Sequence, residues 1–160
     1  MSIDSRLEFC DATALSVASS SVATLCGNVV DTRVAAGAVV GAVPNTLMNL
    51  GGGRPLHWVI TVDTTVVAAS GSSGTTTFNL ATDSTADLAT SRTNHITSPA
   101  FTEAQLVAGF TWNSPLPFQA TYERYLGVYS TQAVDTLTSG KINSYLTYDP
   151  PAATQYADGI

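Results

Sequence analysis

Two histidines are the residues of this chain best suited to act as a general base, and neither has the partners that catalysis requires. His57 shares the polar face of an alternating segment with Asp63, but six residues of extended strand separate the two by about 20 Å. His95 lies in a loop of Ser, Thr and Asn. A hydrolase needs a nucleophile, a base and an orienting group that converge, and no Gly-x-Ser-x-Gly motif is present. We therefore predict no catalytic residues, structural or surface roles for both histidines, and a protein that is not an enzyme.

Residues that bind metals are equally sparse. Two Cys and two His lack the paired spacing of a zinc site. We expect Cys10 and Cys26 to be reduced thiols, because no export signal precedes them, with a Cys10–Cys26 disulfide as the alternative. Asp83 and Asp87 lie in a predicted turn, for which Asx-type hydrogen bonds are the favoured interpretation and a weak calcium site the alternative. We predict no metal and no cofactor.

Three consecutive glycines, Gly51 to Gly53, suggest a loop that could bind phosphate. A phosphate loop is normally completed by the N-terminus of a helix, whereas a strand follows here. A sharp entry into that strand explains the glycines better. Arg54 beside them is a candidate anchor for a carboxylate on a partner protein.

Charge and composition narrow the classes of partner. Charged residues make up 11% of the chain, the net charge is −6, and only six Lys and Arg are spread along it. Because nucleic-acid binding needs a basic stripe, we expect no nucleic-acid partner. Membrane association is not expected either, since the apolar stretch 34–43 is far shorter than the ~20 residues of a span. A surface covered by hydroxyls is easily desolvated, which favours assembled states.

Period-two alternation dominates the sequence and predicts strands. Residues 54–67 place Leu56, Trp58 and Ile60 on one face, as a strand does and a helix does not. A turn at 70–74 leads to a second alternating segment, 75–82, and we expect these two strands to be antiparallel neighbours.

The remaining segments extend this all-β pattern. Further strands are predicted at 22–30, at 104–112 with a kink at Gly109, at 122–130 and at 141–148, with a turn around Ser139-Gly140 before the last. The predicted fold is a jelly-roll-like β-sandwich of six to eight antiparallel strands. It forms a single domain, 1–160, with an N-terminal arm (1–21), a long loop (33–53) and a tail (152–160).

An aromatic cluster is the strongest candidate for an interaction surface. Tyr125 and Tyr129 share one strand face, opposite Leu126 and Val128. A strand buried on both sides of a sandwich explains this pattern. A subunit interface is the functional alternative, because aromatic anchors dominate interface energetics, and a sugar-binding platform is a third.

A set of turn and strand motifs follows in order along the chain: Asp11-Ala12-Thr13-Ala14, Val30-Asp31, Asn49-Leu50-Gly51-Gly52-Gly53-Arg54-Pro55-Leu56, 104–109, Pro115-Leu116-Pro117, Glu123-Arg124-Tyr125-Leu126, Ser139-Gly140-Lys141-Ile142 and Tyr148-Asp149. In this order the motifs resemble those of the capsid cement (decoration) proteins of short-tailed bacteriophages. The resemblance implies a small structural jelly-roll protein that clamps neighbouring major capsid proteins on the virion surface. It also implies a homo-oligomer, expected to be a homodimer, assembled in the host cytoplasm. The alternative is a carbohydrate-binding jelly-roll module of a tail fibre or cell-surface protein.

If the chain binds such a lattice, the arm and the long loop are the best candidates for extended contacts, since flexible connections carry contacts more often than strands do. The residues predicted to contact a partner are Leu7, Phe9, Arg33, Met48, Arg54, Tyr125 and Tyr129.

Overall fold

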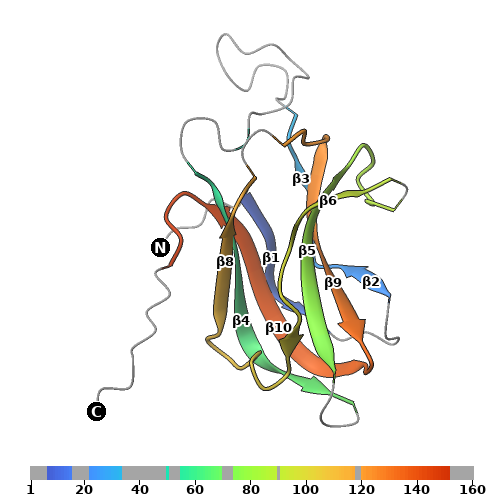
Figure 1. The fold of residues 1–160 in the computed structure, drawn as a ribbon, viewed down its shortest axis with the longest axis vertical. Helices are drawn as coiled ribbons and strands as arrows, with labels where there is room; N and C mark the ends of the chain where they lie inside the picture. The colour runs from blue at the N-terminus through green and yellow to red at the C-terminus, as the bar shows by residue number, and fades with distance from the viewer. Residues whose placement is uncertain are drawn as a thin grey trace.

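The computed structural model is an all-β sandwich (Figure 1). It describes residues 7–15, 22–33, 50, 55–69, 74–89, 91–117 and 120–151. One sheet has the order β1 (Glu8–Ala14), β10 (Leu137–Thr147), β4 (His57–Ala68) and β8 (Thr111–Pro115). The other has the order β2 (Ala23–Leu25), β9 (Tyr125–Ala133), β5 (Thr75–Asp83) and β6 (Thr93–Thr97), with β3 (Val30–Asp31) on β9 and β7 (Phe101–Thr102) on β5.

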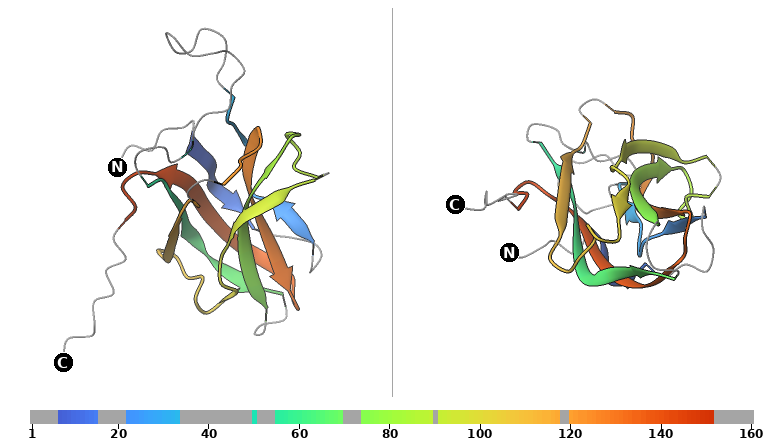
Figure 2. Two further views of the ribbon diagram at one scale, coloured as in Figure 1. Left: turned by 45° about the horizontal axis from the view of Figure 1, so that its top comes forward. Right: turned by 60° about the horizontal axis from the view of Figure 1, so that its bottom comes forward.

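Every pairing in the described residues is antiparallel, and the winding is that of a jelly roll. Counted in chain order along the two sheet paths, the first, eighth, third and sixth strands form one sheet. The second, seventh, fourth and fifth form the other. Two interlocked Greek keys give this order. Figure 2 shows the two sheets facing each other. The predicted fold class is therefore confirmed.

The core lies between the sheets and follows the predicted alternation. Trp58, Ile60 and Val62 of β4 face Phe78 and Leu80 of β5, and all five are almost fully buried. The Trp58 indole is the largest buried side chain, and its Nε1 donates to Ser144 Oγ at 2.8 Å, so burial leaves no donor unpaired there. The apolar periodicity of the sequence is thus explained by an apolar layer buried between the two sheets.

One pairing prediction and one segment prediction differ from the structure. Strands β4 and β5 are not neighbours, because β4 pairs with β10 and β8 while β5 pairs with β9, β6 and β7. The chain crosses from one sheet to the other between them. The N-terminal arm is also partly wrong, since residues 8–14 form β1, an edge strand paired with β10. The rest of segments 1–21, 33–53 and 152–160 lies outside the described residues, apart from Leu7, Leu15, Arg33 and Leu50.

Three strand boundaries also differ from the predictions. Residues 104–110 form turns, with Gly109 at φ 89°, and the strand begins only at Thr111. The predicted strand 22–30 divides into β2 and β3 around Gly27. Gly140 does not mark a turn but lies inside β10, where the register with β4 shifts at a bulge. A bulge absorbs one extra residue, often a glycine, and bends the strand.

Candidate partner-contact site

Residues 31–33 and 123–124 form a polar network at one end of the sandwich, where the chain leaves β3 and enters the 33–53 segment. Strand β3 pairs with the start of β9, so Asp31 lies opposite Tyr125. Immediately after β3, the Thr32 N–H donates to Arg124 O at 2.8 Å and its hydroxyl donates to the same oxygen at 2.7 Å. The hydroxyl also lies 3.2 Å from Glu123 O. Thr32 is almost fully buried, so these bonds fix the backbone where the chain leaves the sheet.

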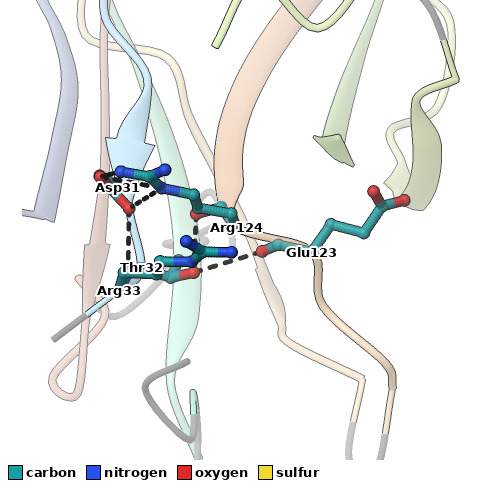
Figure 3. A network of polar contacts seen from close by, with 5 residues as sticks. All are labelled: Asp31, Thr32, Arg33, Glu123 and Arg124. Carbon is teal, nitrogen blue, oxygen red and sulfur yellow. Dashed lines mark hydrogen bonds and ion pairs between the residues drawn. The ribbon is translucent and has the colours of Figure 1, made fainter. Parts of the chain in front are cut away.

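An ion pair between Asp31 and Arg124 lies next to this buried threonine (Figure 3). The Arg124 guanidinium binds both carboxylate oxygens of Asp31, with Nε 3.0 Å from Oδ1 and NH2 2.8 Å from Oδ2. The same carboxylate accepts the Arg33 N–H at 3.0 Å. Hydrogen bonding from Arg124 is the main cause that lowers the pKa of Asp31 below its ordinary value. Arg124 also lies over the Tyr125 ring, 4.7 Å from its centroid.

The arrangement can hold a peptide segment but has no reacting groups in a catalytic geometry. In Figure 3 the Glu123 side chain points away from the network, and only its carbonyl takes part. The exposed Arg33 side chain lies where the chain leaves the sheet after β3, one residue beyond the buried Thr32. A fixed backbone with an exposed guanidinium at its end suits recognition of a carboxylate on another protein.

Buried Thr32 and exposed Asp31–Arg124 should stabilise the fold differently. We expect Thr32→Val to lower the free energy of unfolding by about 1 kcal/mol at any salt concentration. A double-mutant cycle of Asp31→Asn and Arg124→Gln should give a coupling of about 0.2–1 kcal/mol that mostly vanishes in about 1 M salt. Urea unfolding at low and high salt measures both. A salt-dependent effect of Thr32→Val would contradict this assignment.

The residues predicted to contact a partner have different environments. Arg33 and Tyr125 lie together in the network just described, with Arg33 exposed and Tyr125 half-buried. Leu7 is half-buried and packs on the core. Phe9 is 0% exposed and Tyr129 4% exposed, so both serve the interior of this chain and we leave them out of the contact surface. Met48 and Arg54 lie outside the described residues. Sequence reasoning missed Thr32 and Asp31, whose role depends on a pairing that no local pattern reveals.

A comparison of the sequence with models of known protein families gave a match. The family model Bbp16 matches residues 12–146, from Ala12 within β1 to the penultimate residue of β10. The chain belongs to the Bbp16 family. A search of curated proteins gave no match. The Bbp16 match covers both sheets and both residues of the Asp31–Arg124 pair, so the jelly roll and its end network lie within the family region.

A second cluster of buried residues explains where Tyr129 lies. It sits on the outer face of the β9 sheet with Ala81 and Leu88, and its hydroxyl donates to Leu88 O at 2.5 Å. The Arg92 guanidinium covers its ring at 4.5 Å. Strand β9 is therefore buried on both faces, as the structural explanation of its aromatic pattern required. A Cβ on Gly127 would lie 2.9 Å from Leu88 Cδ1, so that glycine leaves the space that Leu88 fills.

Hydrogen bonds to the Asp83 carboxylate hold the loop that contains Leu88 in place. Its carboxylate accepts the backbone N–H of Thr85 at 3.2 Å and of Ser91 at 3.1 Å, and the Ser84 hydroxyl adds a third bond. The Asp87 carboxylate accepts the Ala89 N–H at 3.2 Å. These are the Asx-type bonds that the sequence predicted. Within the described residues, no group of three or more His, Cys, Asp or Glu is placed to hold a metal.

Acid should loosen this loop. Backbone N–H donors, chiefly that of Ser91, lower the pKa of Asp83 to about 2, against about 3.9 in an unfolded chain. A lowered folded-state pKa stabilises the fold above pH about 4, and this contribution is lost as the pH falls towards 2. Thermal melts of the wild type and Asp83→Asn from pH 5 to 2 measure it. The variant should lack this part of the acid dependence, and an Asp87→Asn control should keep it; identical pH profiles for wild type and Asp83→Asn would contradict the assignment.

The two histidines and two cysteines of the chain lie on or beside the strands of the sandwich. His95 Nε2 is 2.7 Å from the Thr82 hydroxyl, its ring lies 4.5 Å from that of Tyr122, and burial lowers its pKa. His57 and Asp63 lie on one strand, β4, as predicted. Cys10 and Cys26 are free and buried, and burial raises their pKa values to about 12 and about 11. In the described residues no helix is long and apolar enough to cross a membrane.

Proposed function

We propose that this chain is a non-enzymatic structural protein of a virion, which binds and reinforces the assembled lattice of a major capsid protein. The observation that carries the proposal is the buried anchor at Thr32, which fixes the exit of the 33–53 segment from a rigid jelly roll. A chain that clamps neighbouring subunits needs contact segments held at a defined place on a stiff body. The motifs that resemble capsid cement proteins run along this same body, and two of them supply Asp31 and Arg124.

Mass action is the physical mechanism of such reinforcement. A protein that binds the assembled lattice and not its separated subunits stabilises the lattice by a free energy that grows with occupancy and affinity. The surface suits broad contacts, because charged residues are only 11% of the chain and an interface of hydroxyls leaves few buried charges unpaired. We include in the proposal a homodimer as the soluble form and the outer capsid surface as the location.

Co-sedimentation tests the proposal. Purified protein is mixed with heads of the parent virus assembled without this chain, and separately with unassembled capsid subunits. We expect saturable binding to the heads and little binding to the subunits. Arg33→Glu should weaken the binding, because it reverses the exposed charge at the network. Thr97→Ser, an exposed change on β6, is the matched control. No binding of the wild type to heads would remove the proposal.

A carbohydrate-binding module is the second candidate, and the described surface supports it less. Sugar platforms use exposed aromatic rings, and Tyr148 is the one aromatic side chain more than a third exposed in the part of the chain that the structure describes. Trp58 is fully buried and Trp112 packs edge-on against it, with ring centroids 5.2 Å apart. A glycan array gives the discriminating result: specific sugar binding would favour this second candidate.

A further inference from the structure

The end of the sandwich opposite the Arg33 network carries a group of exposed valines. Strand β9 runs from Tyr125 beside Arg124 to Ala133, so its two ends mark opposite ends of the molecule (Figure 1). Val134 follows β9 and is 78% exposed, while Val67 near the end of β4 and Val107 beside it are 46% and 47% exposed. Most of the large exposed apolar side chains in the described residues are therefore gathered here; Val22 and Tyr148 are the others.

Hydrogen bonds place these valines on neighbouring segments. The Thr138 hydroxyl donates to Val67 O at 3.2 Å, and Ala69 N–H donates to Thr136 O at 2.8 Å, so the turn that holds Val134 lies against the end of β4. On the other edge of β4, Ala108 N–H donates to the Thr65 hydroxyl at 3.0 Å. We call Val67, Val107 and Val134 the valine end.

Val134 has a backbone conformation that does not suit its side chain. Its φ is 76°, in the left-handed region, where a β-branched residue is a genuine outlier. The turn from β9 to β10 connects the two sheets, and turns normally place Gly, Asn or Asp at positions of positive φ. The side chain is 78% exposed, so its packing against the described residues offsets little of the strain. Strain at an exposed residue is a reason to look for a function outside the chain.

The charges at the valine end indicate the chemistry of its partner. Glu103, Asp135 and Asp63 lie on the segments that carry the valines, and Lys141, opposite Thr64, is the cation on them among the described residues. Glu103 accepts the Ala68 N–H at 2.8 Å, and Asp135 accepts the Thr136 N–H at 2.8 Å. An apolar patch with an acidic rim is complemented by an apolar depression rimmed by Lys or Arg.

We propose that the valine end is a second docking surface, which inserts Val134 into an apolar depression with a basic rim on a capsid subunit, while the Arg33 end contacts a neighbouring one. This inference rests on the proposed function and adds to it, because a protein that joins two subunits needs two separate contact surfaces. The occupant is a protein surface of the assembled lattice. The acidic rim disfavours a second copy of the same end, since like charges would face each other.

The variant Val134→Asn distinguishes an effect on docking from an effect on stability. Asparagine tolerates positive φ, and the substitution replaces the apolar side chain by a polar one. We expect its melting temperature to rise by about 2–4 °C and its affinity for heads that lack the chain to fall about tenfold or more. Val134→Gly and Val107→Ser should also weaken binding, while Thr97→Ser, the exposed change on β6 opposite Asn79 in the middle of β5, should not.

Binding of Val134→Asn and Val107→Ser with wild-type affinity would overturn the second docking surface and leave the proposed function standing. A wild-type chain that does not bind heads would overturn both. A melting temperature of Val134→Asn at or below that of the wild type would overturn the strain on which the inference depends.

Discussion

Gly27→Ala should unfold this protein or destabilise it by more than about 4 kcal/mol. Gly27 has φ 75°, and an added Cβ would collide with Phe9 O and lie 2.7 Å from Cys10 Cβ. Both obstacles belong to β1, whose carbonyl at Phe9 accepts the Asn28 N–H at 2.7 Å. Backbone atoms cannot move aside without breaking that bond between the sheets. The loss combines strain at positive φ with a clash that has no room to relax.

Gly109→Ala is the matched control for this prediction. Its φ of 89° is as unfavourable for alanine, but no atom lies within 4 Å of the added Cβ. We expect a loss of only about 1–2 kcal/mol, which is the conformational cost alone. Chemical denaturation of the two variants measures the difference. Equal losses at the two glycines would show that the close approach of β1 to Gly27 is wrong.

Trp58→Ala should lower the free energy of unfolding by about 3–5 kcal/mol. The indole is 0% exposed between the two sheets, packs edge-on with Trp112 and donates to Ser144 Oγ. Removing it leaves a large cavity that β4 and β10 cannot close, because paired strands fix the backbone on both sides. Trp58→Phe keeps most of the volume and loses the hydrogen bond, so it should cost less. A loss below about 1 kcal/mol for Trp58→Ala would contradict the packed core.

The alternation of β4, β5 and β10 predicted the fold class because period two directly records which face is buried. The partners of those strands were not predictable in the same way. Strands β4 and β5 follow one another closely in sequence, and a hairpin is the usual outcome for such segments. In a jelly roll the connection instead crosses between sheets. Alternation on one strand contains no information about which other strand lies beside it.

Irregular backbone hid two further features from the sequence. Strand β1 has two register shifts against β10, and Ala12 has φ 44°, so its burial does not alternate. The turn between β9 and β10 contains Val134 and neither Gly nor Pro, whereas Gly140 lies inside a strand. Gly140, a residue type that usually marks a turn, therefore predicted this turn at the wrong position. The strained valine and the bulged glycine are consequences of tertiary pairing that composition does not record.

The residues of the candidate contact site were also predictable only in part. Arg33 and Arg54 were selected as cations in or beside the long loop, and Tyr125 as an aromatic anchor; Arg33 and Tyr125 lie at the end network, and Arg54 lies outside the described residues. Phe9 and Tyr129 were selected as aromatic or apolar anchors and are buried in this chain. Residue type identifies what can bind a partner. Exposure, which decides whether it does, depends on pairings distant in sequence, such as β3 with β9.

Heat-induced rupture of virus heads tests the central proposal most directly. Heads assembled without this chain are titrated with purified protein, and genome release is followed by dye fluorescence as the temperature rises. If the chain reinforces the lattice, the rupture temperature increases with occupancy until the sites are filled; at about 100 times the Kd the stabilisation approaches about 2.7 kcal/mol per site. An unchanged rupture temperature at saturating protein would contradict the account.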